Sequence, residues 1–231
     1  MFHRTLTSLS LIAEMGGAHV QAKTPSYPPF RDYTMPRDAE LALARTAAPP
    51  TITDHATLKI LTQKGFEVAH EGSNGFTCVV MRGWSAPTYT PNQFIDFTYD
   101  ATIRAPICFD PIASRTVLPY YELRSKLGME GKTPNQIAEL VASAYASGAL
   151  PKRPGVSFAY MWSAEQQLGQ GIGHWHPHVM IFAPGYTNDM VGGNAFGSVL
   201  PQLSDDAGTP FAVVVIPVDQ SLAIKGNGAR Q

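Results

Sequence analysis

The order of the apolar segments along the chain constrains its fold more than any other feature of the sequence. After a short N-terminal helical segment come runs of strand length, then two segments with helical periodicity, and then further strand-like runs. Regular alternation of strands and helices would instead indicate a parallel βαβ sheet. The sequence therefore predicts an α+β fold in a single domain, with a mostly antiparallel sheet, two or three helices packed on it and long Pro-rich loops. The strand-like runs cover residues 57–61, 66–70, 76–81, 156–162, 178–182 and 211–218.

Three segments carry helical signals. Residues 133–136 read Thr-Pro-Asn-Gln, a capping box with proline at the first helical position, and an apolar stripe continues from there to Gly148. Pro36 opens another helical segment, and Pro119 opens one that Gly128 closes. We expect the helix that begins in the capping box to pack on the sheet.

Two connections between the predicted elements differ in character. Asn74 and Gly75 form a strong turn signal between the second and third strand-like runs, which predicts an antiparallel meander for the first three runs. Prolines and aromatic residues interrupt residues 83–111. This pattern predicts a long irregular segment there.

Charge and hydropathy exclude two classes of partner. The chain has 17 Lys and Arg residues against 18 Asp and Glu residues, so it carries no positive excess that would hold a nucleic-acid backbone. The longest apolar run, residues 211–218, contains Pro217 and is far shorter than the roughly 20 residues of a membrane-spanning helix. We expect no nucleic-acid partner and no transmembrane segment.

The N-terminus has the weak features of a secretory signal peptide. Arg4 precedes a short apolar stretch that Glu14 interrupts, and Ala22 offers a small residue for cleavage. These features predict cleavage near Ala22 and a periplasmic or secreted protein, the alternative being a cytoplasmic protein with an N-terminal extension. The predicted division is a signal peptide at 1–22, an extended leader at 23–35, a single α+β domain at 36–220 and a flexible C-terminal tail at 221–231.

The two cysteines, Cys78 and Cys108, lack the C-x-x-C spacing of zinc or thioredoxin-type sites. In an oxidising compartment they would most simply form one disulfide, which closes a loop of about thirty residues and contributes roughly 3–4 kcal/mol. In the cytosol they would be two buried thiols.

Three histidines, His174, His176 and His178, lead directly into an apolar run. Alternate side chains of an extended segment share a face, so neighbouring imidazoles could bind one divalent transition metal, zinc or copper, at about 2.0–2.1 Å. The alternatives are a core histidine at 178 bonded to backbone, with the other two on a solvent loop, or acid–base catalysis by His178 without a metal. Further metal ligands could come from His55, His70, Glu71, Asp110, Glu165 or Asp189.

No nucleophile motif, phosphate-binding loop or dinucleotide fingerprint occurs, so the catalytic residues of any enzyme activity are unknown.

Aromatic residues gather in the segment that we expect to be irregular. Exposed, they could stack on sugar rings; buried, they would form a satellite core. They are Trp84, Tyr89, Phe94, Phe97 and Tyr99.

Several short motifs carry a resemblance. They are Gly75-Phe76-Thr77-Cys78, Cys108-Phe109-Asp110-Pro111, residues 177–184, Gly208-Thr209-Pro210 and Ile216-Pro217-Val218. With them the chain resembles, over residues 39–218, a family of uncharacterised bacterial proteins that usually carry export signals. That family has no assigned reaction or ligand. The resemblance implies export and a Cys78–Cys108 disulfide, and it includes His178 but not His174 or His176.

The sequence thus predicts an exported globular protein of unknown activity that acts as a binding or cell-envelope-associated domain. Its predicted partner is a small molecule, a glycan or an envelope protein. The alternative is a metal-dependent enzyme with a site built around His174, His176 and His178.

Overall fold

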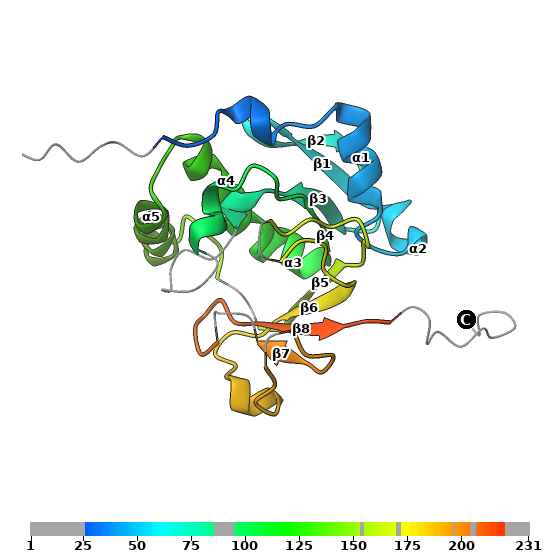
Figure 1. The fold of residues 1–231 in the computed structure, drawn as a ribbon, viewed down its shortest axis with the longest axis vertical. Helices are drawn as coiled ribbons and strands as arrows, with labels where there is room; N and C mark the ends of the chain where they lie inside the picture. The colour runs from blue at the N-terminus through cyan, green and yellow to red at the C-terminus, as the bar shows by residue number, and fades with distance from the viewer. Residues whose placement is uncertain are drawn as a thin grey trace, which may run out of the picture.

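One sheet runs through the whole computed structural model, which describes residues 26–85, 95–152, 155–169, 172–195, 197–203 and 207–219. Within these ranges its eight strands follow the order β2-β1-β3-β4-β5-β6-β8-β7 (Figure 1). The predicted α+β class is therefore confirmed. The strands are β1 (Thr57–Thr62), β2 (Gly65–His70), β3 (Thr77–Met81), β4 (Ala105–Phe109), β5 (Ser157–Met161), β6 (His178–Phe182), β7 (Gln202–Leu203) and β8 (Val213–Pro217).

Neighbouring strands pair antiparallel except β1 and β3, which are parallel. The predicted meander is therefore wrong at its third strand, because β3 lies beside β1 rather than β2. The loop before β3 is fastened to another segment. Asn74 donates from Nδ2 to the carbonyl of Ile52 at 2.8 Å and accepts from the Phe76 amide at 3.0 Å, which directs the chain back along β1.

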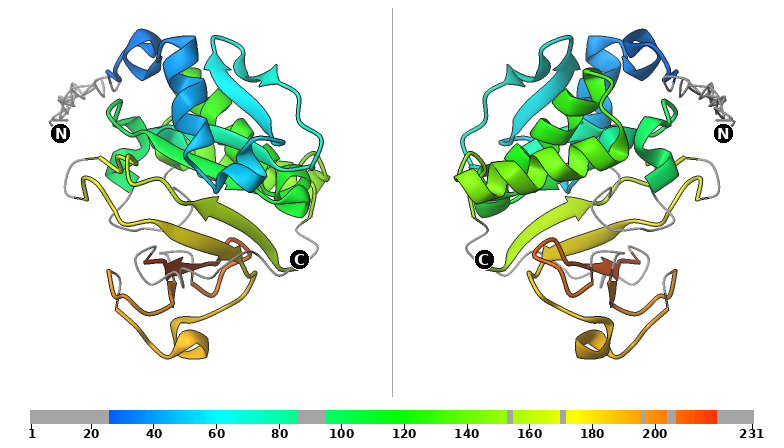
Figure 2. Two further views of the ribbon diagram at one scale, coloured as in Figure 1. Left: turned by 90° about the vertical axis from the view of Figure 1, so that its right-hand side faces the viewer. Right: turned by 90° about the vertical axis from the view of Figure 1, so that its left-hand side faces the viewer.

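Helices lie on both sides of the sheet, as the two views of Figure 2 show. Helix α1 contacts β1, β3 and β4, whereas α3 contacts β4 and β5 and joins the main core on the opposite face. The helices are α1 (Arg37–Arg45), α2 (Pro50–Thr53), α3 (Pro111–Thr116), α4 (Leu118–Met129) and α5 (Pro134–Ser147); short 3-10 helices are η1 (Phe30–Tyr33), η2 (Gly83–Ser85), η3 (Ile95–Tyr99) and η4 (Asn188–Val191).

Helix α3 begins where the sequence predicted irregular chain. Asp110 caps it, accepting from the Ala113 amide at 2.6 Å, and its second carboxylate oxygen accepts from the Phe158 amide of β5 at 3.1 Å. One carboxylate therefore holds α3 against the sheet. The preceding strand β4 also corrects that prediction, since its residues are buried throughout and the prolines of residues 83–111 concealed the strand pattern.

The capping box at Thr133 and Gln136 is confirmed, with both reciprocal bonds formed, and Gly148 ends α5 in the left-handed conformation. The helix does not pack on the sheet as predicted. Its buried residues Ile137 and Val141 instead join a cluster with residues of α4. A second layer of helix on helix therefore covers this side, and α4 separates α5 from the strands.

Gly128 has a different role from the predicted helix stop. Helix α4 continues through it to Met129, and a Cβ atom at Gly128 would lie 2.3 Å from the Trp84 ring. The glycine therefore lets the indole pack directly on the helix backbone.

The N-terminal part of the described chain corrects the prediction of an extended leader. Tyr33 in η1 is buried and joins a cluster with Leu61 and Trp84. Residues 26–35 thus belong to the folded domain. The predicted signal peptide at 1–22, the tail at 221–231 and residues 86–94 of the Pro-rich segment lie outside the described residues.

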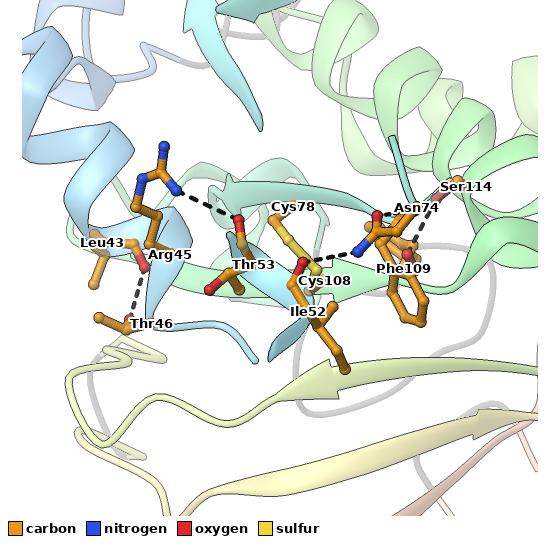
Figure 3. The surroundings of a disulfide bond; sticks show 11 residues. Leu43, Arg45, Thr46, Ile52, Thr53, Asn74, Cys78, Cys108, Phe109 and Ser114 are labelled. Atoms are coloured by element: carbon orange, nitrogen blue, oxygen red, sulfur yellow. Dashed lines mark hydrogen bonds between the residues drawn. A yellow bond between two sulfur atoms is a disulfide. The ribbon is translucent and has the colours of Figure 1, made fainter. Parts of the chain in front are cut away.

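The disulfide between Cys78 and Cys108 is present, and it joins residues directly opposite each other on β3 and β4. Both side chains are fully buried beneath α1 and α2 (Figure 3). The Arg45 side chain bonds to the Thr53 carbonyl at 3.4 Å and so links the two helices over the bridge. The disulfide lies inside a packed layer, away from solvent.

Candidate functional site

His178 opens β6 with its side chain on the face of the main core, where only 2% of it is exposed. Its Nδ1 atom lies 3.1 Å from the carbonyl oxygen of His176. Because a carbonyl only accepts, Nδ1 carries the proton of the neutral ring, and Nε2 keeps its lone pair. Burial lowers the pKa of His178 to about 4; the hydrogen bond to the His176 carbonyl opposes this shift, and the charge of the His176 side chain adds a smaller lowering effect.

The loop before β6 is held by a buried amide. Gln166 donates from Nε2 to the carbonyls of Ser163 at 3.1 Å and His176 at 3.0 Å. In the described part of the chain, Gln166 Oε1 and His176 Nε2 are buried atoms without a hydrogen-bond partner. The ring of Trp175 contacts both imidazoles, with centroids 5.1 Å from His176 and 5.0 Å from His178.

The predicted metal ligands are not brought to one point. Across the described ranges, no group of three or more His, Cys, Asp or Glu side chains could hold a metal ion. His174 is exposed and its backbone bridges to Gln167. Asp110, one of the additional candidates, caps α3. The geometry of His178 matches the alternative of a core histidine bonded to backbone.

Burial of a neutral imidazole makes stability depend on pH. Because the pKa of His178 is lower in the fold than the roughly 6.5 of an unfolded chain, the unfolded state binds a proton first as the pH falls. Its contribution is complete above pH 6.5 and is lost on acidification towards about pH 4. Between pH 7 and pH 5 we expect the free energy of unfolding to fall by about 2 kcal/mol. The variant His178→Asn should not show this loss, because asparagine can still donate a hydrogen bond but does not titrate. Urea unfolding at both pH values measures this, with His174→Asn as the exposed control; equal losses in all three proteins would contradict it.

The aromatic residues of the predicted irregular segment divide into two groups. Trp84 is buried and stacked on Tyr33, with centroids 4.1 Å apart. Phe97 and Tyr99 are partly buried, Phe97 against the main core and Tyr99 against the cluster of Tyr33, Leu61 and Trp84. These residues match the satellite-core interpretation, because their side chains pack against buried clusters. Tyr89 and Phe94 lie outside the described residues.

A cavity of about 340 Å³ opens between η1, the β1–β2 turn and the C-terminal end of α4. We call it the α4 pocket. Its volume lies within the range of small-molecule sites, about 300–1,000 Å³. It is lined by Phe30, Gln63, Lys64, Lys126, Met129 and Glu130.

Short-range structure places the residues of the α4 pocket. The β1–β2 turn presents Gln63 and Lys64, and the Thr62 hydroxyl fixes it by accepting from the Lys64 amide and donating to the Gly65 carbonyl, both at 3.0 Å. Phe30 and Met129 pack against the buried cluster of Tyr33, Leu61 and Trp84. The pocket therefore has an apolar floor on a packed base and a polar rim.

Sequence reasoning did not find this pocket. Its lining residues come from three segments distant in the sequence, and each is an ordinary surface or core residue taken alone. The nearest signal was the short gap between the strand-like runs 57–61 and 66–70, where the structure has the β1–β2 turn. The β1–β2 turn becomes part of a cavity wall only because η1 and α4 pack around it.

Comparisons with protein-family models, curated proteins and solved structures find no match to this chain. The resemblance to exported bacterial proteins therefore remains a prediction. Within the described ranges, no helix is long and apolar enough to cross a membrane.

Proposed function

We propose that this protein is an exported, disulfide-linked binding domain that holds a small molecule in the α4 pocket. The observation that carries the proposal is the pocket itself, which joins an apolar floor to a charged rim. Such a combination lets a ligand bury apolar surface while a few polar groups orient it.

Export has separate support. The Cys78–Cys108 disulfide fits an oxidising compartment, as the weak signal-peptide features of residues 1–22 do. We therefore propose a periplasmic or secreted protein. Intact-mass measurement of protein from the native host tests this, since cleavage near Ala22 predicts a mature chain beginning near Lys23, whereas a cytoplasmic chain that retains residues 1–22 would contradict export.

The metal-dependent enzyme has less support. His178 commits Nδ1 to the His176 carbonyl, and His174 is exposed on the loop, so a metal would need ligands that the described residues do not gather. Elemental analysis of protein purified without an affinity tag tests this alternative, because stoichiometric zinc or copper would restore it.

Binding of an uncharged phenylnaphthylamine, whose fluorescence rises in apolar surroundings, tests the pocket. We expect saturable enhancement in the native protein and a dissociation constant about tenfold higher in Phe30→Ala, because the variant loses much of the apolar floor. Tyr186→Ala removes an exposed aromatic side chain outside the pocket and should leave the constant unchanged. Equal binding by all three proteins, or no enhancement, would refute the α4 pocket as the site.

A further inference from the structure

The rim of the α4 pocket carries charges of both signs. Lys64 stands on the β1–β2 turn, Lys126 on α4 and Glu130 just beyond the end of α4, and all three are exposed. Among the described residues none of the three forms an ion pair, although Lys126 and Glu130 are four positions apart. Their charges are therefore available to a ligand.

Lys59, on β1, differs from the rim residues because its charge is already paired. It pairs with Glu122 at 2.5 Å, so both its charge and that of Glu122 are already used. Glu122 and Glu130 thus have different roles. Glu122 fastens α4 to β1, whereas Glu130 faces the cavity.

The helix end adds to the negative side of the rim. The C-terminus of an α-helix carries a partial negative charge, roughly half a unit, which attracts cations. Glu130 is the C-cap residue of α4, so its carboxylate and the helix end act on the same part of the pocket. A ligand bearing only negative charge would meet the two lysines but would be repelled here.

We propose that the α4 pocket binds a zwitterionic apolar amino acid. Its carboxylate would lie between Lys64 and Lys126, its ammonium group towards Glu130, and its side chain on Phe30 and Met129. This inference rests on the proposed function and adds the ligand class. Each charge of the amino acid then meets an unpaired charge of opposite sign, and its apolar side chain packs on the apolar floor.

Three probes separate the contributions: L-phenylalanine, phenylpropionate without the ammonium group, and phenethylamine without the carboxylate. Titration calorimetry should give L-phenylalanine the tightest binding. Lys64→Gln and Lys126→Gln should each weaken L-phenylalanine and phenylpropionate about threefold and spare phenethylamine, as expected for exposed ion pairs. Glu130→Gln should weaken L-phenylalanine and phenethylamine and spare phenylpropionate. Lys152→Gln changes an exposed lysine outside the pocket and should affect none of them.

The outcomes distinguish this inference from the proposed function. If phenylpropionate binds as tightly as L-phenylalanine and Glu130→Gln changes nothing, the zwitterion is wrong, while the Phe30→Ala effect on the fluorescent probe still supports the pocket. If the charged probes bind equally to every variant, the rim charges select nothing and the inference fails in the same way. If the fluorescent probe does not bind either, the proposed function itself fails.

Discussion

Replacing Cys78 and Cys108 together with alanine should lower the free energy of unfolding by about 3–4 kcal/mol. The bridge joins residues 30 positions apart, and its loss restores that loop's conformational freedom to the unfolded chain. Both side chains are buried, so alanine adds no polar atom to the layer beneath α1 and α2. Urea unfolding at neutral pH measures the change, which is a large fraction of the roughly 5–15 kcal/mol that stabilises a domain.

Reductant provides the matched control for the disulfide. It should shift the unfolding midpoint of the native protein towards that of the double variant and leave the double variant unmoved. A native protein and a double variant with the same midpoint would show that the layer beneath α1 and α2 is held by its packing alone.

Local sequence signals predicted most of the helices and strands but not which strands pair with each other in the sheet. The capping box of α5 and the short connection between β1 and β2 involve residues within a few positions of one another, so the sequence contains their full cause. Strand order does not have a local cause. The parallel pairing of β3 with β1 is accompanied by the bond from Asn74 to the Ile52 carbonyl, which joins segments that sequence periodicity treats separately.

The other failures of prediction came from prolines that suggested irregular chain and from a loop with its own backbone pairing. Prolines at the borders of β4 and α3 suggested irregular chain, yet Pro106 lies within a strand and Pro111 opens a helix. At the predicted site, the spacing of the histidines was correct for one face of a strand, but only His178 lies in β6. The loop that carries His174 and His176 has its own backbone pairing, so alternation no longer directs their side chains.

Glu40 also shows that a local sequence pattern does not reveal a residue's tertiary contacts. In the sequence it is an acid in the first turn of a helix, where a solvent-exposed carboxylate would interact favourably with the positive end of the helix dipole. In the fold it is 1% exposed at the side chain, and its Oε1 atom accepts from Arg82 Nη2 at 2.8 Å and from the Leu61 amide at 3.1 Å. Arg82 is fully buried and also donates to the carbonyls of Tyr33 and Val80. The pair thus connects α1, β1, β3 and η1.

Glu40→Ala should lower the free energy of unfolding by about 3–5 kcal/mol, because it leaves the guanidinium of Arg82 buried without its counter-charge. Burial already lowers the pKa of Arg82 to about 10, against the opposing effect of Glu40, so the group stays charged at neutral pH and must be accommodated. Urea unfolding at pH 7 measures the loss. Glu40→Gln keeps an oxygen that can accept from the Leu61 amide and should lose less.

A double variant decides whether the unpaired charge, rather than lost packing, causes this effect. Glu40→Leu with Arg82→Met replaces both partners by apolar side chains, and a buried ion pair exchanged in this way often costs little stability. We therefore expect the double variant to be more stable than Glu40→Ala although it carries more substitutions. If it is less stable, the carbonyls of Tyr33 and Val80, which lose the donors of Arg82, contribute more than the counter-charge does.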